Sequence, residues 1–301
     1  MAVSSASGAA GEGGGRGAGV SPVWFVVIAV LLWSTGGVFI KKAGTLSAAE
    51  LSGARALFAA ATVMLLTRRE GFRLNIVTAA AAVFYAALLY LFVRATLMTT
   101  AANAIFLQYT APIYILLAEP LVYKEEYRWQ DFAVVAFCVA GMSLFFVGEL
   151  RPQDVEGNLT ALGSGACFAV FYLLLRHPRA RRVNRASSVI YGNLLLALVM
   201  TPAVVSGAEH FTATNLALTA YLGVVQLGVA YTLLTLGIAR GVKSLDAGII
   251  GYIEPVLNPV WVFLFLGERP AKWALVGGAI IMAAVASHTV WAARARMKAE
   301  G

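Results

Sequence analysis

Residues 245–268, LDAGIIGYIEPVLNPVWVFLFLGE, are apolar enough to cross a bilayer, yet they contain a carboxylate and two prolines well inside the apolar run. Glu254 lies about ten residues into the stretch, roughly 15 Å along a helix, where a charged side chain is costly unless it faces a partner or water. Pro255 and Pro259 each remove a backbone hydrogen bond. Freed carbonyls at that depth are tolerated only where protein or a cavity surrounds them. The stretch therefore predicts one wall of a site inside the membrane; the alternative is a proline-kinked packing helix with a neutral glutamate.

A second stretch repeats this pattern 143 residues earlier, within NAIFLQYTAPIYILLAEPLVYKEE (103–126). Tyr109 and Pro112 take the places of Tyr252 and Pro255, and an acidic residue follows the proline by thirteen positions in both stretches. We interpret the two stretches as copies of one repeat. Pro112, Pro255 and Pro259 are the expected helix-breaking residues.

The composition predicts an integral membrane protein. Of the 301 residues, 60% are hydrophobic and only 13% are charged, whereas soluble domains contain about twice that share of charged residues. The net charge is +8, but the basic residues stand singly or in short groups between apolar runs. That distribution is typical of cytoplasmic loops. We therefore expect a lipid bilayer around the protein and no nucleic-acid partner.

Ten apolar runs follow an N-terminal segment that is dominated by Gly, Ala and Ser. They lie at 22–40, 48–67, 74–94, 100–122, 130–148, 158–176, 187–205, 215–238, 244–266 and 272–293. Each is close to the roughly 20 residues that a helix needs to cross a bilayer, and helices satisfy the backbone of such runs without water. The sequence predicts an all-α integral membrane protein with ten transmembrane helices.

Lysine and arginine counts predict how these spans cross the membrane. With the N-terminus inside, the cytoplasmic segments carry 16 basic residues and the outside segments carry six. This bias predicts a multi-pass protein of the cell (inner) membrane with both termini in the cytoplasm. Glu119 then lies near the cytoplasmic end of span four, where a carboxylate costs little.

An odd number of spans in each half forces the two copies to cross in opposite directions, so the five-helix repeats must be inverted. We expect a flexible N-terminal tail (1–21), a first repeat with spans one to five (22–148), a second repeat with spans six to ten (149–293) and a basic C-terminal tail (294–301).

Aromatic and polar side chains reach the middle of several spans. Buried hydroxyl and amide groups need hydrogen-bond partners, so these residues should face the bundle or a wet cavity and not lipid. The candidate substrate-binding residues are Trp33, Tyr85, Tyr90, Gln108, Tyr109, Gln226, Tyr231, Tyr252, Glu254 and Asn258. For most of them the alternative is ordinary packing or a hydrogen bond between helices. Together they predict a site that suits a ligand with an apolar body and a few polar groups.

Arg55 is the only lysine or arginine that lies inside a span and not at its end. It either extends to the outer surface or neutralises a carboxylate. Glu50 is the closer candidate in sequence, and Glu254 is the candidate in space. As a charge partner for the substrate, Arg55 favours an amino acid over an organic cation, because only the amino acid offers a carboxylate. Aromatic rings near Glu254 would attract the ammonium group of either ligand.

Catalytic motifs are absent from the sequence. The three histidines lie in loops or in the last span, and neither HExxH nor GxSxG occurs. We therefore expect no enzyme activity, no metal site and no cofactor. A membrane sensor is disfavoured because the loops are too short to hold an output domain.

The order of these motifs resembles the EamA-type branch of the drug/metabolite transporter superfamily. The residues that carry the likeness are Trp33 with its following glycines, Arg55, Tyr109 to Pro112, Glu125, Trp129-Gln130, Tyr231, Tyr252, Glu254-Pro255 and Leu266-Gly267-Glu268. The likeness covers nearly everything after the tail. It implies ten helices in two inverted repeats, a central cavity bordered mainly by spans three, four, eight and nine, and export of small metabolites such as amino acids. The direction of transport rests on this resemblance alone.

Two features depart from the resemblance. The first half ends in Lys124-Glu125-Glu126, where the second half has Gly-Glu. Small multidrug-resistance relatives carry a glutamate in their first helix, and VWFVVIAVLLWSTGGVF has none, so the coupling ion is a proton bound elsewhere or is absent. The expected function is export of small neutral or zwitterionic metabolites by alternating access, with amino acids as the leading class. The alternative is an exporter of drugs or organic cations; a membrane sensor or an intramembrane enzyme is less favoured.

Overall fold

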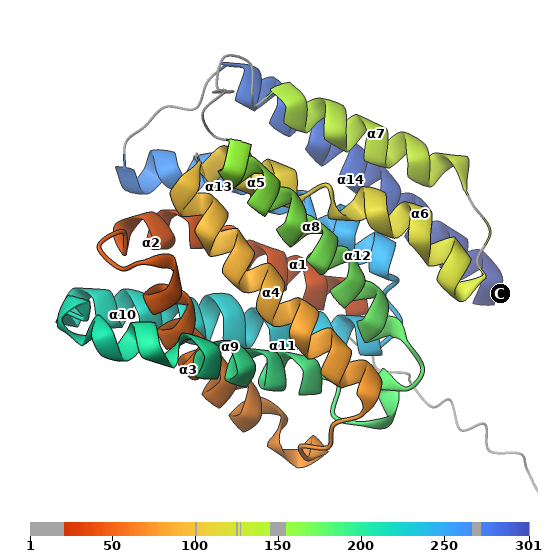
Figure 1. Ribbon diagram of the computed structural model, residues 1–301. Helices are drawn as coiled ribbons and strands as arrows, with labels where there is room; N and C mark the ends of the chain where they lie inside the picture. Colours follow the sequence, from red (N-terminus) through yellow and green to blue (C-terminus); the bar gives the residue numbers. More distant parts are fainter. Residues whose placement is uncertain are drawn as a thin grey trace, which may run out of the picture.

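All the regular secondary structure in the part of the chain that the structure describes is helical. The computed structural model describes residues 21–99, 101–124, 126, 128–144, 155–266 and 272–300. The first half contains α1 (Pro22–Trp33), α2 (Gly36–Lys42), α3 (Ala48–Thr67), η1 (Arg68–Glu70), α4 (Ile76–Met98), α5 (Ala101–Gln108), α6 (Ala111–Tyr123) and α7 (Trp129–Ser143). The second half contains α8 (Val155–Arg176), η4 (Ala180–Arg182), α9 (Ser187–Ser206), η5 (Ala208–His210), α10 (Ala213–Tyr221), η6 (Leu222–Val229), α11 (Ala230–Ala239), α12 (Ser244–Gly251), α13 (Ile253–Leu266) and α14 (Lys272–Glu300) (Figure 1).

Ten helical runs match the ten predicted spans. Within the described residues, eight are long and apolar enough to cross a bilayer, and two shorter apolar helices, Trp129–Ser143 and Leu275–Trp291, take the places of spans five and ten. Large apolar side chains such as Leu121 and Leu198 remain exposed on the bundle. Such a surface is stable where lipid covers it. The prediction of an all-α, ten-helix membrane protein is confirmed.

Contacts between helices repeat from one half to the other. Spans two and seven meet through α3 and α9, spans four and nine through α6 and α12, and spans five and ten through α7 and α14. In each pair a span touches its own counterpart, as expected of spans that lie beside a two-fold axis relating the halves. Other close contacts also come in equivalent sets. Span three packs on span six through α4 and α8, and span eight packs on span one through α11 and α1. With five spans in each half, this arrangement is an inverted repeat.

Two equivalent spans are broken near their middles. Tyr109 stands between α5 and α6, and Tyr252 stands between α12 and α13. Pro112 and Pro255 follow in the first turn of the next helix, where a missing N–H group leaves no hydrogen bond unmade. The prolines therefore mark the starts of the second segments. Pro259 lies further along α13, and its side chain is outside the described part of the chain.

The first and eighth spans are irregular as well. Ser34 and Thr35 separate α1 from α2, and both hydroxyls donate to carbonyls three residues earlier. The eighth span holds a π-helical segment, η6, which packs against α3. A Cβ atom on Gly223 would collide with the backbone carbonyl of Arg55, so glycine is needed for this approach. π-Helical segments often occur at functional sites.

We call the two ends of the bundle the inner face and the outer face, after the predicted orientation. The inner face holds residues 68–75, 177–186 and 240–243, and the outer face holds residues 43–47 and 207–212. α7 and α14 lie side by side at one edge of the bundle (Figure 1). α14 continues to Glu300 through the segment that the sequence predicts as a C-terminal tail. Its Ala, Arg, Met and Lys residues are good helix formers.

Candidate functional site

A small internal space, the central cavity, lies where helices of both halves meet. Its volume is about 30 Å³, which is enough for one water molecule. The lining residues are Trp33, Arg55, Leu88, Leu89, Phe92, Gln108, Phe168, Gln226, Leu227, Tyr231 and Glu254. Spans that are far apart in sequence thus bring six of the predicted residues to one place. They are Trp33, Arg55, Gln108, Gln226, Tyr231 and Glu254.

Arg55 brings a buried positive charge to the central cavity. The residue is 1% exposed, so it does not extend to the outer surface. One terminal nitrogen donates to the Leu89 carbonyl at 3.3 Å, and the Nε atom has no hydrogen-bond partner in the described part of the chain. No carboxylate of the described residues forms an ion pair with it. A buried guanidinium without a counter-charge is costly, so a ligand carboxylate would stabilise this arrangement.

Glu254 brings a carboxylate to the same cavity. It is 8% exposed and lies in the first turn of α13, where the helix dipole favours negative charge. One carboxylate oxygen accepts a hydrogen bond from the Tyr109 hydroxyl at 2.6 Å. Glu254 is therefore held by Tyr109 and not by Arg55. The cavity carries one acidic and one basic group that are not paired with each other.

Two other lining residues have polar atoms without partners among the described residues. They are the Nε1 atom of Trp33 and the Oε1 atom of Gln226. The indole N–H is a donor, and the amide oxygen is an acceptor. A buried polar group without a partner costs about 1–3 kcal/mol. A ligand that offers both an acceptor and a donor would remove this cost.

Aromatic rings form one wall of the cavity. The ring of Tyr231 lies 4.7 Å from that of Trp33 and 4.8 Å from that of Tyr85, between ring centres. Phe168 lies 6.0 Å from Trp33 in an edge-to-face arrangement. Ring faces of this kind bind apolar groups, and they attract cations.

Hydrogen bonds fix the polar lining in position. The Gln108 amide donates to the Ser164 hydroxyl at 2.7 Å, and this hydroxyl donates to the Leu88 carbonyl at 2.9 Å. These bonds tie the fourth, sixth and third spans together. The Asn193 amide donates to the Tyr85 hydroxyl at 3.1 Å. This bond holds the Tyr85 ring, which packs against the Tyr231 ring of the aromatic wall.

The remaining predicted residues lie around the cavity and do not line it. The Tyr252 ring is fully buried behind Tyr109, with 5.7 Å between the ring centres. The Asn258 amide packs against Gly37 at the start of α2. Tyr90 is half-buried on α4 and packs against the apolar core.

Three residues near the site were not singled out from the sequence. Phe168 lines the cavity, Ser164 holds Gln108, and the Trp261 indole donates to the Ser34 hydroxyl at 2.8 Å beside the break in the first span. Phe168 had a signal, because it begins an aromatic group with Phe171 and Tyr172 in one span. Single serines and tryptophans in apolar runs carry no such signal.

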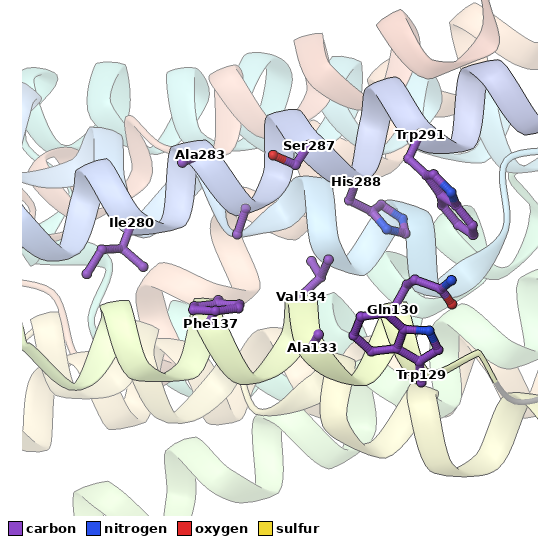
Figure 2. Close-up of a pocket in the computed structure, with 11 residues that line it drawn as sticks. Trp129, Gln130, Ala133, Val134, Phe137, Ile280, Ala283, Ser287, His288 and Trp291 are labelled. Atoms are coloured by element: carbon purple, nitrogen blue, oxygen red, sulfur yellow. The ribbon is translucent and has the colours of Figure 1, made fainter.

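A larger groove of about 510 Å³ lies between α7 and α14, away from the central cavity (Figure 2). Its walls are mainly apolar, with Phe137 on one helix and Ile280 on the other. The His288 ring lies at one end, where its Nε2 atom is 3.0 Å from an Asp246 oxygen. The groove shares no lining residue with the central cavity. Within the described ranges, no three His, Cys, Asp or Glu side chains come together as metal ligands.

Comparison with known proteins places this arrangement in context. A family model described as the EamA-like transporter family matches residues 20–147 and 155–289. The chain is 25% identical over 273 residues to a probable terminal-alkyne amino-acid exporter of Streptantibioticus cattleyicolor, covering 87% of this chain and 91% of that protein. It is 28% identical over 203 residues to the threonine/homoserine exporter RhtA of Escherichia coli K12, covering 66% of each.

One solved crystal structure has the same fold, with a TM-score of 0.75. Its sequence is 20% identical, and the match covers 91% of this chain and 98% of the other.

Proposed function

The chain belongs to the EamA-like transporter family, and we propose that it exports small zwitterionic or neutral metabolites, with amino acids as the leading class. The names of two relatives support this proposal, since one is a probable amino-acid exporter and the other a threonine/homoserine exporter. The direction of transport is taken from these relatives.

The observation that carries the proposal is the pair of unmatched charges at the central cavity. Arg55 has no carboxylate partner in the described part of the chain, and Glu254 has only a neutral one, Tyr109. A zwitterion offers one group to each of them. A simple anion or cation would satisfy one charge and leave the other buried.

The hydrogen-bonding groups suggest how an amino acid is held. The substrate carboxylate would accept from the Arg55 Nε–H and the Trp33 indole N–H, both of which lack partners among the described residues. The substrate ammonium would donate to Glu254 and to the Gln226 amide oxygen, beside the Tyr231 ring face. The apolar side chains of α4 would then contact the substrate side chain.

The small size of the cavity supports an alternating-access mechanism. A space of about 30 Å³ is far smaller than the roughly 300–1,000 Å³ of typical ligand pockets. We propose that this arrangement is an occluded state. The two repeats, 22–148 and 149–293, would open the cavity to one face at a time. Both termini would lie in the cytoplasm and the protein in the cell membrane, as the basic loops predict.

One observation favours a second candidate, an exporter of organic cations. Glu254 and the rings of Trp33 and Tyr231 border the same space, and such a group would also hold a quaternary amine. Arg55 opposes this candidate, because its charge would repel a cation inside a low-dielectric cavity.

Thermal unfolding in detergent with matched ligands tests the proposal. The ligands are an amino acid, its methyl ester and the amine that decarboxylation of it yields. A ligand at 100 times its Kd stabilises the folded state by about 2.7 kcal/mol, so only the intact amino acid should raise the melting temperature by several degrees. Arg55→Met should abolish this shift. Arg94→Met is the control, because the Arg94 side chain is partly exposed and pairs with Glu156 away from the cavity. If the ester and the amine stabilise the protein as well as the amino acid, the organic-cation candidate replaces this one.

A further inference from the structure

The buried Glu119 carboxylate forms an ion pair with the half-buried Arg176 at the inner face, and neither residue contributes to the central cavity. We propose that Glu119, Arg176 and the N-terminus of α12 form a latch that closes the inner face, and that releasing this latch opens the cavity to the cytoplasm. The inference rests on the proposed transport function, because a latch is useful only to a protein whose inner face opens.

The Glu119 carboxylate joins three spans at one point. It belongs to α6 and is 3% exposed. It accepts a hydrogen bond from an Arg176 terminal nitrogen at 2.7 Å, at the end of α8. It also accepts from the backbone N–H groups of Ser244 and Leu245, each at 3.2 Å, in the first turn of α12. A carboxylate at a helix N-terminus satisfies N–H groups that have no partner within the helix and interacts favourably with the helix dipole.

Further contacts hold Arg176 and the start of α12 in place. The Arg176 guanidinium lies over the Tyr123 ring, 4.9 Å from its centre. The Tyr123 hydroxyl donates to the Leu173 carbonyl, and the Ser244 hydroxyl donates to the Tyr172 carbonyl at 3.1 Å. The inner ends of the fourth, sixth and ninth spans are thus tied to one another.

These three spans also carry residues of the central cavity. Gln108 ends α5 in the fourth span, Phe168 lies two turns before Arg176 in the sixth, and Glu254 follows α12 in the ninth. α6 and α12 pack directly on each other between the latch and the cavity. Separation of α6 from α12 would therefore connect the cavity with the inner face.

The inverted repeat predicts an equivalent position at the outer face, and the sequence differs there. Glu119 is ten residues beyond Tyr109, and the residue ten beyond Tyr252 is Val262. In the part of the outer end that the structure describes, Lys42 lies 5.8 Å from the centre of the Phe265 ring. This contact resembles that of Arg176 with Tyr123. The cation–ring contact therefore recurs at both faces, whereas the position ten residues beyond the break tyrosine is a carboxylate only at the inner face.

Cysteine labelling from the inner face measures the latch without any substrate. Ile115 is fully buried on α6, one turn before Glu119, and faces Gly248 of α12. Ile115→Cys is introduced after Cys138→Ala and Cys167→Ala remove the native thiols. Inside-out vesicles are then treated with a membrane-impermeant maleimide.

Glu119→Gln should raise the labelling rate about tenfold, the population change that corresponds to about 1.4 kcal/mol. Arg176→Gln should raise it by a smaller factor, because the two backbone N–H groups still hold the carboxylate. This second variant keeps the test informative if the first fails to fold.

Glu50→Gln is the matched control. Glu50 is also a buried carboxylate with a basic partner at a helix N-terminus, but it lies at the outer face and pairs with His210. Its substitution should leave inner-face labelling unchanged. The latch is refuted if folded Glu119→Gln labels no faster than the parent, or if Glu50→Gln accelerates labelling equally. If labelling responds as expected but no amino acid is transported, the latch holds and the proposed substrate fails.

Discussion

The Tyr109 hydroxyl lies 2.6 Å from a Glu254 carboxylate oxygen, although 145 residues separate them in sequence. Tyr109 stands at the break of the fourth span, and Glu254 lies two residues after the break of the ninth. The contact therefore joins the two repeats at the level where both of their equivalent spans are interrupted. It also leaves Arg55 without a carboxylate partner among the described residues, which is the basis of the proposed substrate class.

The first prediction concerns this contact. Glu254→Gln keeps the shape of the side chain and removes its charge. A hydrogen bond to a charged group contributes about 1.5–3 kcal/mol, so amino-acid efflux from proteoliposomes should slow at least about tenfold. Tyr109→Phe removes one donor and should slow it less. If Glu254→Gln transports normally at every pH between 6 and 8, neither substrate binding nor proton coupling uses this charge.

A second prediction separates the charge of Arg55 from its shape. Arg55→Lys keeps a cation but loses the planar donor fork, and it should raise KM for amino acids about tenfold. Arg55→Met should abolish amino-acid transport and leave any transport of an amine intact. Uptake kinetics measure both effects, with Arg94→Met as the control for loss of an arginine outside the cavity. Equal losses for the amino acid and the amine would contradict a role in carboxylate recognition.

Gly36 provides a third prediction. A Cβ atom there would lie 2.7 Å from the Gln226 amide nitrogen, so Gly36→Ala must displace that flexible side chain. We expect KM to rise several-fold while the melting temperature changes little. Gly163→Ala is the matched control, because among the described residues its Cβ would meet only Leu91, at an ordinary 3.7 Å. An unchanged KM for Gly36→Ala would show that the position of Gln226 is unimportant for binding.

A fourth prediction concerns pH and the outer face. The hydrogen bond that the His210 ring donates to the Glu50 carboxylate raises the pKa of His210 above its usual value of 6.5. The protonated pair therefore stabilises the folded state fully below about pH 6.5, and this contribution is lost as the pH rises through the higher pKa of the folded state. His210→Gln should lower the melting temperature at pH 5.5 and should have little effect at pH 8.5. A difference between the two proteins that does not vary with pH would argue against the charged pair.

The repeat and the helix breaks could be predicted because they depend on local chemistry. The spacing of Tyr109 and Pro112 matches that of Tyr252 and Pro255, and proline restricts the backbone wherever it occurs. The predicted position of each break, at the proline, differs from the position in the structure. Proline is well tolerated in the first turn of a helix, so the interruption lies just before it, at the tyrosine.

The pairing of charges could not be predicted, because it depends on how spans pack. Glu50 was the closest carboxylate to Arg55 in sequence, but it caps α3 and pairs with His210. Glu119 was expected at a span end where a carboxylate costs little. It is instead buried, since α8 and α12 close over it. Only the tertiary arrangement decides which of these groups remain unmatched at a cavity.

The most direct test of the central claim is the efflux of labelled amino acids from proteoliposomes. Vesicles that contain the protein should lose labelled amino acid faster than protein-free vesicles, and Glu254→Gln should return the rate close to the protein-free value. Unlabelled amino acid on the opposite side should accelerate the exchange, whereas the matched methyl ester should not. If no amino acid moves faster than through bare lipid while a quaternary amine does, the zwitterion site is contradicted and the protein is an exporter of organic cations.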